Sequence, residues 1–172
     1  YPQITGVGEG SLRSGLIHRL DVETSGVIIF ALTDQHYQTL RSAFADHQTR
    51  KVYRAIVHGR LDGQGEEQVD LIVARHKPAF VEVANDPTRP GVRRCSLNWH
   101  ALQQSGKRTL IEVDLHTGFL HQIRATFAAK GHPIIGDDRY GGGDASAGRL
   151  MLHAMSLAVC GIEAHATMPF GL

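Results

Sequence analysis

RCSLNWHA, the stretch from Arg94 to Ala101, shows the clearest two-residue period in this chain of 172 residues. Its alternate residues are apolar or small, and Ser96, Asn98 and His100 between them are polar. TLIEVDLH at 109–116 repeats the pattern, with acidic residues on its polar side. Such alternation is typical of a sheet that is covered on one face, and these sheets are usually antiparallel. We therefore predict two strands of a mainly antiparallel sheet.

Working outward from these strands, the remaining segments predict more strands than helices. The continuous apolar run GVIIFAL at 26–32 has the length and composition of a buried strand. Periodicity and capping residues predict further strands at 51–58, 68–74 and 79–84, and helices at 34–47 and 121–130. Strands and helices do not alternate along the chain. The fold class is therefore α+β, with a mixed, mainly antiparallel sheet and flanking helices.

Composition excludes several classes of protein. Hydrophobic residues make up 42% and charged residues 20%, which is typical of a globular protein and excludes wholesale disorder. No apolar run is long enough to span a bilayer, so we expect no membrane association. Two distant cysteines favour a reducing cytoplasm. We expect one domain over residues 1–172, which could be a fragment of a longer protein.

Charge is unevenly distributed although the formal net charge is only +1. The segment 47–60 carries four Lys or Arg residues and no acidic residue, whereas 61–70 carries four acidic residues and no base. This distribution suits a protein with one positive face, although solvated loops would give the same pattern.

The densest group of reactive side chains is HRLDVETSG at 18–26, directly before the apolar run. A loop that leads into a core strand can hold Asp21 rigidly and still expose it to a ligand, where it could act as a nucleophile or a base. The alternative is a plain turn in which Asp21 and Thr24 bond to nearby backbone groups. A long Gly-rich loop at 131–149 is a second candidate region, because loops of this length are often functional.

Three segments resemble the RluA-type pseudouridine synthases. HRLDVETSG resembles the family signature H-R-L-D-x-x-T-S-G, KVYRA at 51–55 resembles K-x-Y-x-A, and LHTGFLHQIR at 115–124 resembles L-x-T-G-R-x-H-Q-I-R. Two positions depart from the family pattern: Phe119 replaces an Arg, and Thr126 replaces a frequent His. A strand that usually precedes the signature is absent, which favours an N-terminally truncated catalytic domain.

The resemblance implies an enzyme that isomerises specific uridines in structured ribosomal or transfer RNA to pseudouridine, without metal or organic cofactor. It assigns Asp21 as the catalytic carboxylate, Tyr53 as the aromatic residue against the target base, and Arg124 as the partner of the carboxylate. Read without the family, Tyr53 is an ordinary half-buried strand residue and Arg124 a surface or core-bridging residue.

The expected partner is an RNA stem-loop, with no obligate protein partner. Arg19 is expected to occupy the space that the flipped nucleotide leaves. The full set of expected RNA-binding residues is His18, Arg19, Thr24, Arg50, Lys51, Arg54, His121 and Arg139. Two other functions remain open: a catalytically silent RNA-binding protein, and a metallohydrolase using His116 and His121, which lack a carboxylate motif beside them.

Overall fold

The two strands with the clearest alternation lie side by side in the sheet of the computed structural model, which describes residues 2–172. β5 (Arg93–Ser105) and β6 (Arg108–Leu115) pair antiparallel, with Trp99 opposite Val113. The inward residues Cys95, Leu97 and Trp99 are buried. The prediction of these strands and of their buried face is confirmed.

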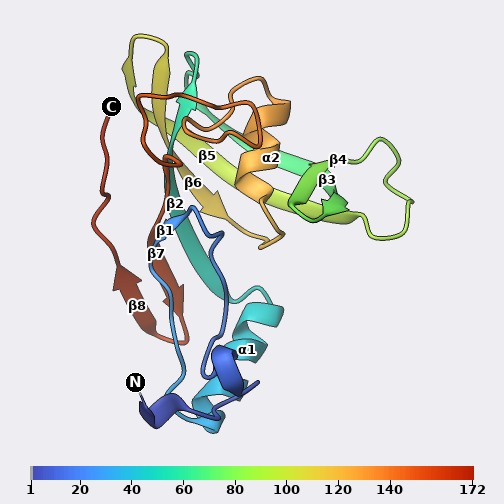
Figure 1. Cartoon of the computed structure of the whole chain (residues 1–172), viewed down its shortest axis with the longest axis vertical. Coiled ribbons are helices and arrows are strands. Elements are labelled where there is room, and N and C mark those ends of the chain that lie inside the picture. Colours follow the sequence, from blue (N-terminus) through green and yellow to red (C-terminus); the bar gives the residue numbers. More distant parts are fainter. Residues whose placement is uncertain (1) are drawn as a thin grey trace.

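The described residues form one mixed sheet of eight strands in the order β1-β7-β2-β6-β5-β3-β4, with β8 paired to β7 (Figure 1). Only β1 and β7 run parallel, and the other pairs are antiparallel. The remaining strands are β1 (Ser25–Gly26), β2 (Thr49–His58), β3 (Gln64–His76), β4 (Ala79–Val83), β7 (Leu152–Val159) and β8 (Ile162–His165). The helices are α1 (Asp34–Ala45) and α2 (Gln122–Ala129), with 3-10 turns at Pro2–Ile4 and Ser11–Arg13. The predicted fold class is confirmed.

The segment 26–32 is not the buried strand that its apolar run predicts. Only Ser25 and Gly26 pair with β7, and the chain then leaves the sheet after Val27 donates a backbone hydrogen bond to Ala154. Gly26 has a φ of +128°, and a Cβ there would lie 2.3 Å from the Ala154 carbonyl oxygen. Beyond it, Ile28, Phe30 and Leu32 are exposed. The apolar run is therefore an edge segment, and its backbone changes direction at a glycine.

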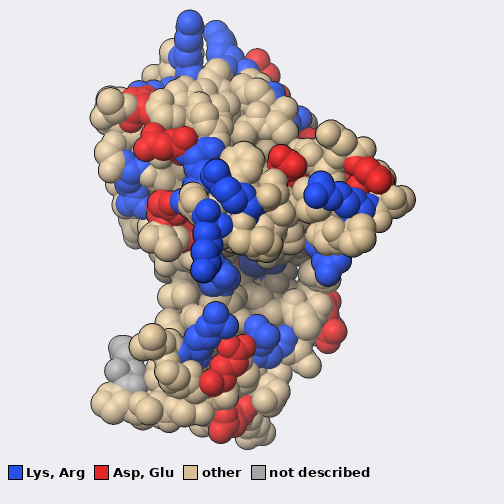
Figure 2. Space-filling model, turned by 45° about the vertical axis from the view of Figure 1, so that its right-hand side comes forward, with Lys and Arg blue, Asp and Glu red and all other residues tan. Residues whose placement is uncertain are grey.

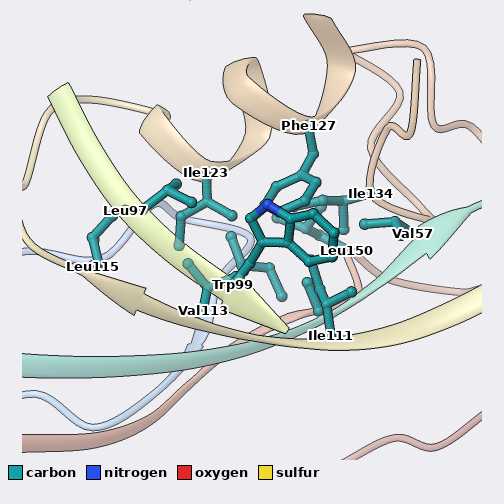
Figure 3. Close-up of a cluster of buried hydrophobic side chains, with 12 residues drawn as sticks. Val57, Leu97, Trp99, Ile111, Val113, Leu115, Ile123, Phe127, Ile134 and Leu150 are labelled. Atoms are coloured by element: carbon teal, nitrogen blue, oxygen red, sulfur yellow. The ribbon is translucent and has the colours of Figure 1, made fainter. Parts of the chain in front are cut away.

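The main core lies between the sheet and α2 (Figure 3). Phe127 of α2 is fully buried and meets the edge of Trp99, with ring centroids 6.2 Å apart. Ile123, one turn earlier, packs into the same cluster. Because α2 is fixed on the core by these side chains, the polar residues that share the helix with them are held in place too.

A second, smaller core holds α1 at the end of the molecule where the N-terminal segment lies (Figure 1). Thr33 caps this helix, because its side chain accepts a hydrogen bond from the His36 backbone N–H. Tyr37, Leu40 and Ala43 form its buried face. No helix within residues 2–172 is both long and apolar enough to cross a membrane.

Candidate active site

A cleft of about 440 Å³ lies where the signature loop, α1, β2 and the segment at 115–124 meet. Its lining includes Asp21, Tyr53 and Arg124, the three residues expected to carry the chemistry. On the face drawn in Figure 2, Lys and Arg side chains lie above and below a hollowed waist. The chain therefore brings its candidate residues to one concave site from three separate segments, and α1 completes the wall.

Arg124 connects the candidate carboxylate to the core. Its side chain is 2% exposed, and its Nη1 donates to Asp21 Oδ2 at 3.2 Å. Its Nε and Nη2 donate to the two oxygens of Asp137 at 2.7 and 2.8 Å. The guanidinium also lies 5.2 Å from the centroid of the Tyr140 ring. Asp137 thus fixes the plane of the guanidinium by a bidentate pair, and the remaining nitrogen faces Asp21.

Arg124 remains charged in this setting. Burial opposes the charge, but the hydrogen bonds and negative charge of Asp137 and the nearby Asp21 outweigh it and raise the pKa of Arg124. Glu23 adds a third carboxylate, with Oε2 at 3.5 Å from Nη1. The arrangement places a permanent positive charge beside the Asp21 carboxylate.

His121 lies on the other side of Asp21, at the left-handed residue that precedes α2. The Tyr140 hydroxyl accepts from the Val81 N–H at 2.8 Å and lies 2.9 Å from His121 Nδ1, to which it can donate. Burial lowers the pKa of His121, and the attraction of Asp21 offsets part of that shift. The neutral ring then carries its proton on Nε2, which lies 4.0 Å from Asp21 Oδ1.

Tyr53 forms an aromatic wall of the cleft. Burial, and then the negative charge of Asp21, raise the pKa of Tyr53 to about 12. The phenol is therefore protonated at neutral pH, and the side chain lines the cleft. Its ring face and its hydroxyl are both available to a ligand.

The expected RNA-binding residues divide into two groups. Those that line the cleft are His18, Arg19, Thr24, Lys51 and His121. Those that lie outside its lining are Arg50, Arg54 and Arg139, which pair with Asp114, Glu112 and Glu23 respectively.

The alternative that the signature loop is a plain turn, with Asp21 and Thr24 bonded to nearby backbone groups, is confirmed only in part. The Thr24 N–H does bond to the Asp21 carbonyl, but the Thr24 hydroxyl is buried without a partner among residues 2–172. His116 is exposed, and no three potential metal ligands converge within the described part of the chain.

Sequence reasoning missed three residues of the site: Glu23, Arg41 and Asp137. Asp137 belongs to the Gly-rich loop, which the sequence nominates as a region. In that loop the sequence suggests an RNA contact for Tyr140, and the structure places its hydroxyl between Val81 and His121 instead. Gly142 lies where that loop folds back on itself. A Cβ there would lie 1.8 Å from the Ile134 carbonyl oxygen, so the close approach requires glycine. Arg41 lies on α1. In the sequence it looks like any charged residue on the solvated face of a helix, so no signal marks it as part of the site.

Comparisons with known proteins agree on one family. The family model described as RNA pseudouridylate synthase matches residues 7–129. An uncharacterized RNA pseudouridine synthase of Helicobacter pylori strain J99 is 36% identical over 155 residues, which is 90% of this chain and 62% of the relative. The ribosomal large subunit pseudouridine synthase D of Zymomonas mobilis is 34% identical over 142 residues, which is 81% of this chain and 43% of the relative.

A solved structure, human RNA pseudouridylate synthase domain containing 1, has the same fold. Its TM-score is 0.79 at 22% identity, and the match covers 90% of this chain and 69% of that one. The chain spans less than two thirds of the length of the curated relatives named above.

Proposed function

Because the chain belongs to the RNA pseudouridylate synthase family, we propose that it converts uridines in structured RNA to pseudouridine, with Asp21 as the catalytic carboxylate. In this reaction the bond between the base and the ribose breaks, the uracil rotates, and a carbon of the base bonds to the same sugar. That carbon loses its proton to water, and the ring nitrogen released from the sugar takes up a proton, so the net reaction is an isomerisation without a co-substrate.

The observation that carries this proposal is the position of Asp21. Its carboxylate lines a cleft between the Arg124 guanidinium, at 3.2 Å, and the aromatic ring of Tyr53. A carboxylate in this position can face the ribose of a bound nucleotide while Arg124 holds it in orientation. Tyr53 packs against the uracil, which contributes about 1–3 kcal/mol of stacking. Its protonated hydroxyl can also hydrogen-bond to a base oxygen.

The uridine must leave its stack to reach this cleft, which costs a few kcal/mol. Arg19 is exposed at the cleft and is free to occupy the vacated place, because a planar guanidinium stacks on neighbouring bases and contacts phosphate. The proposal therefore gives Asp21, Tyr53, Arg124 and Arg19 separate tasks.

Ribosomal and transfer RNA are the proposed substrates. The name of the Zymomonas relative refers to the large ribosomal subunit, so large-subunit ribosomal RNA is the first substrate to test. Free Cys95 and Cys160 are consistent with action in a reducing cytoplasm.

The test is tritium release from unmodified ribosomal and transfer RNA transcripts that carry uridine labelled at carbon 5. Formation of pseudouridine replaces the hydrogen at that carbon, so label enters water. We expect release with the wild-type chain and at least a 100-fold slower release with Asp21→Asn, as for loss of an essential acid–base group or nucleophile.

The matched control is Glu163→Gln, which removes an exposed carboxylate whose one ion-pair partner among residues 2–172 is His165. It should keep the wild-type rate. RNA binding by the wild-type chain without any release of label would overturn the proposal and favour a catalytically silent RNA-binding protein.

A further inference from the structure

Three cations at the cleft lack an acidic partner. Arg19, Arg41 and Lys51 all line it, and none of them pairs with a carboxylate within residues 2–172. By contrast, Arg50 and Arg54 on the same strand as Lys51 pair with Asp114 and Glu112. Among the described cations of β2, the one without an acidic partner is therefore the one that lines the cleft.

Lys51 is the most enclosed of the three. Its Nζ donates to the Thr117 carbonyl at 3.3 Å, and burial lowers its pKa, with Asp114 opposing the shift. Its charge also reaches His18, whose pKa falls to about 4 through burial and then through Lys51. A partly buried ammonium without a counter-ion is unfavourable, and an incoming anion would relieve that cost.

Arg41 approaches the same place from α1. Its Nη1 donates to the Ile17 carbonyl at 3.2 Å, which leaves its other nitrogens available. One turn later, Phe44 stacks on His18 with ring centroids 5.1 Å apart. Arg41 and Lys51 thus lie beside His18 on two different elements. The space beside the Lys51 ammonium is open on the side of Gly118, which has no side chain to fill it.

The distance to the proposed base site is short. Lys51 and Tyr53 are two residues apart on β2 and both line the cleft, so their Cα atoms lie roughly 6.6 Å apart. An anion held by Lys51 would therefore be next to a base stacked on Tyr53. In an RNA strand, the group that lies next to a base and carries a charge is the phosphodiester.

We propose that Arg41 and Lys51 form a seat for one RNA phosphodiester adjacent to the flipped uridine. This deepens the proposed function and rests on it for the identity of the base on Tyr53. The planar guanidinium binds two phosphate oxygens, and the ammonium supplies a point charge from the other side. The seat holds the backbone while the base turns into the cleft.

The test measures binding of fluorescent oligouridylate U12 to the full chain by anisotropy over a range of KCl concentrations. For single-stranded RNA, each phosphate contact contributes about 0.7 to the slope of log Kd against log salt. Because the seat holds one phosphate, we expect the double variant Arg41→Gln/Lys51→Gln to lower the slope by about 0.7. Arg41→Gln and Lys51→Gln alone should each lower it by part of that amount and weaken binding at low salt by about tenfold. Circular dichroism shows that each variant is folded.

The matched control is Arg60→Gln, which removes an exposed arginine outside the cleft lining and without an acidic partner among the described residues. Its slope should equal that of the wild type. Slopes equal to that of the wild type in both Arg41→Gln and Lys51→Gln, or an equal decrease of the slope in Arg60→Gln, would overturn the proposed phosphate seat. Failure of the isomerase proposal is distinguishable. In that case the wild-type chain would release no tritium, whereas the slope would still fall in the seat variants.

Discussion

At the scale of single residues, Arg124 joins stability to chemistry. Two of its nitrogens bind the fully buried Asp137, and the third faces Asp21 and Glu23. A buried arginine with this geometry is held mainly by its bidentate partner. The side chain that prepares Asp21 is thus also part of the folded core, and a change at Asp137 should affect both.

Asp137→Asn should lower the free energy of unfolding by about 3 kcal/mol, because it leaves the buried Arg124 charge without its main counter-charge. Isomerase activity should fall as well, since the guanidinium loses its fixed plane. The control is the adjacent Asp138→Asn, at an exposed carboxylate, which should change stability by less than about 0.5 kcal/mol. Urea unfolding measures the stability of both variants. Equal stability of Asp137→Asn and Asp138→Asn would contradict the role of Asp137 as the main partner of Arg124.

His18 should make the protein sensitive to acid. Its folded-state pKa is about 4, below the ordinary value of 6.5, because it is buried and lies near Lys51. As the pH falls below 6.5 the unfolded chain takes up the proton first, so stability present at neutral pH is lost as the pH falls toward 4. The loss from this group should be on the order of 2 kcal/mol after solvent screening.

The measurement compares His18→Gln with the wild type at pH 7.5 and pH 4.5. Other titrating groups cancel in the difference, and the glutamine oxygen can still accept from the Ile29 N–H that His18 binds. The variant should gain stability relative to the wild type by on the order of 2 kcal/mol at the lower pH. A difference independent of pH would show that His18 does not titrate in this way.

At the scale of elements, the signature loop is anchored by its last residue. Gly26 ends the two-residue strand β1, and its φ of +128° and its close approach to Ala154 exclude a side chain. Ser25 before it bonds to His153 and Arg149. The short parallel pair with β7 therefore fixes the end of the loop that carries Asp21.

Gly26→Ala should lower the free energy of unfolding by about 3 kcal/mol, since it combines backbone strain with a steric clash. Gly161→Ala is the control: this glycine between β7 and β8 has a φ of +76° but open space around its Cα. It should cost only about 1 kcal/mol, the cost of the left-handed backbone alone. Thermal or urea unfolding checks the difference, and similar losses would mean that contact with β7 is unimportant.

The elements also show what the sequence can predict. Strands covered on one face, such as β5 and β6, carry a visible alternation. β6 was predicted within one residue of its bounds, whereas β5 continues to Ser105, four residues beyond the predicted end. β7 was missed, because Leu152, His153 and Ala154 are buried in succession and leave no period to detect. The run at 26–32 misled for the opposite reason, since its apolar residues include exposed ones at an edge.

The candidate site also contains residues that the sequence could predict and residues that it could not. Asp21, Tyr53 and Arg124 stand in recognisable motifs, so their convergence could be expected from the family resemblance. The partnership of Arg124 with Asp137 depends on how the Gly-rich loop folds back on α2, and no local pattern encodes it. The same is true of Arg41, whose place at the cleft follows from the docking of α1.

At the scale of the whole molecule, the cleft depends on a core that lies behind it. Phe127 and Ile123 hold α2 on the sheet, and the same helix carries Arg124. Phe127→Ala should lower the free energy of unfolding by about 3–5 kcal/mol through lost burial and the remaining cavity. Phe30→Ala, at a side chain that is 44% exposed, should cost far less.

Denaturant unfolding tests this pair, with the m-value confirming that both variants unfold as the wild type does. Equal losses of stability in Phe127→Ala and Phe30→Ala would mean that the main core does not lie between α2 and the sheet. We also expect Phe127→Ala to lose isomerase activity in proportion to its folded fraction, because the helix and the site are disrupted together.

The carboxylates of Asp21, Glu23 and Asp137 gather around Arg124, with Arg139 on Glu23. Of these three, only Asp21 reaches the lining of the cleft, which it shares with Arg19, Arg41 and Lys51. Opposite charges are therefore segregated within one concave surface. A polyanion should settle with its backbone on the cationic part and present an uncharged heterocycle to the acidic part.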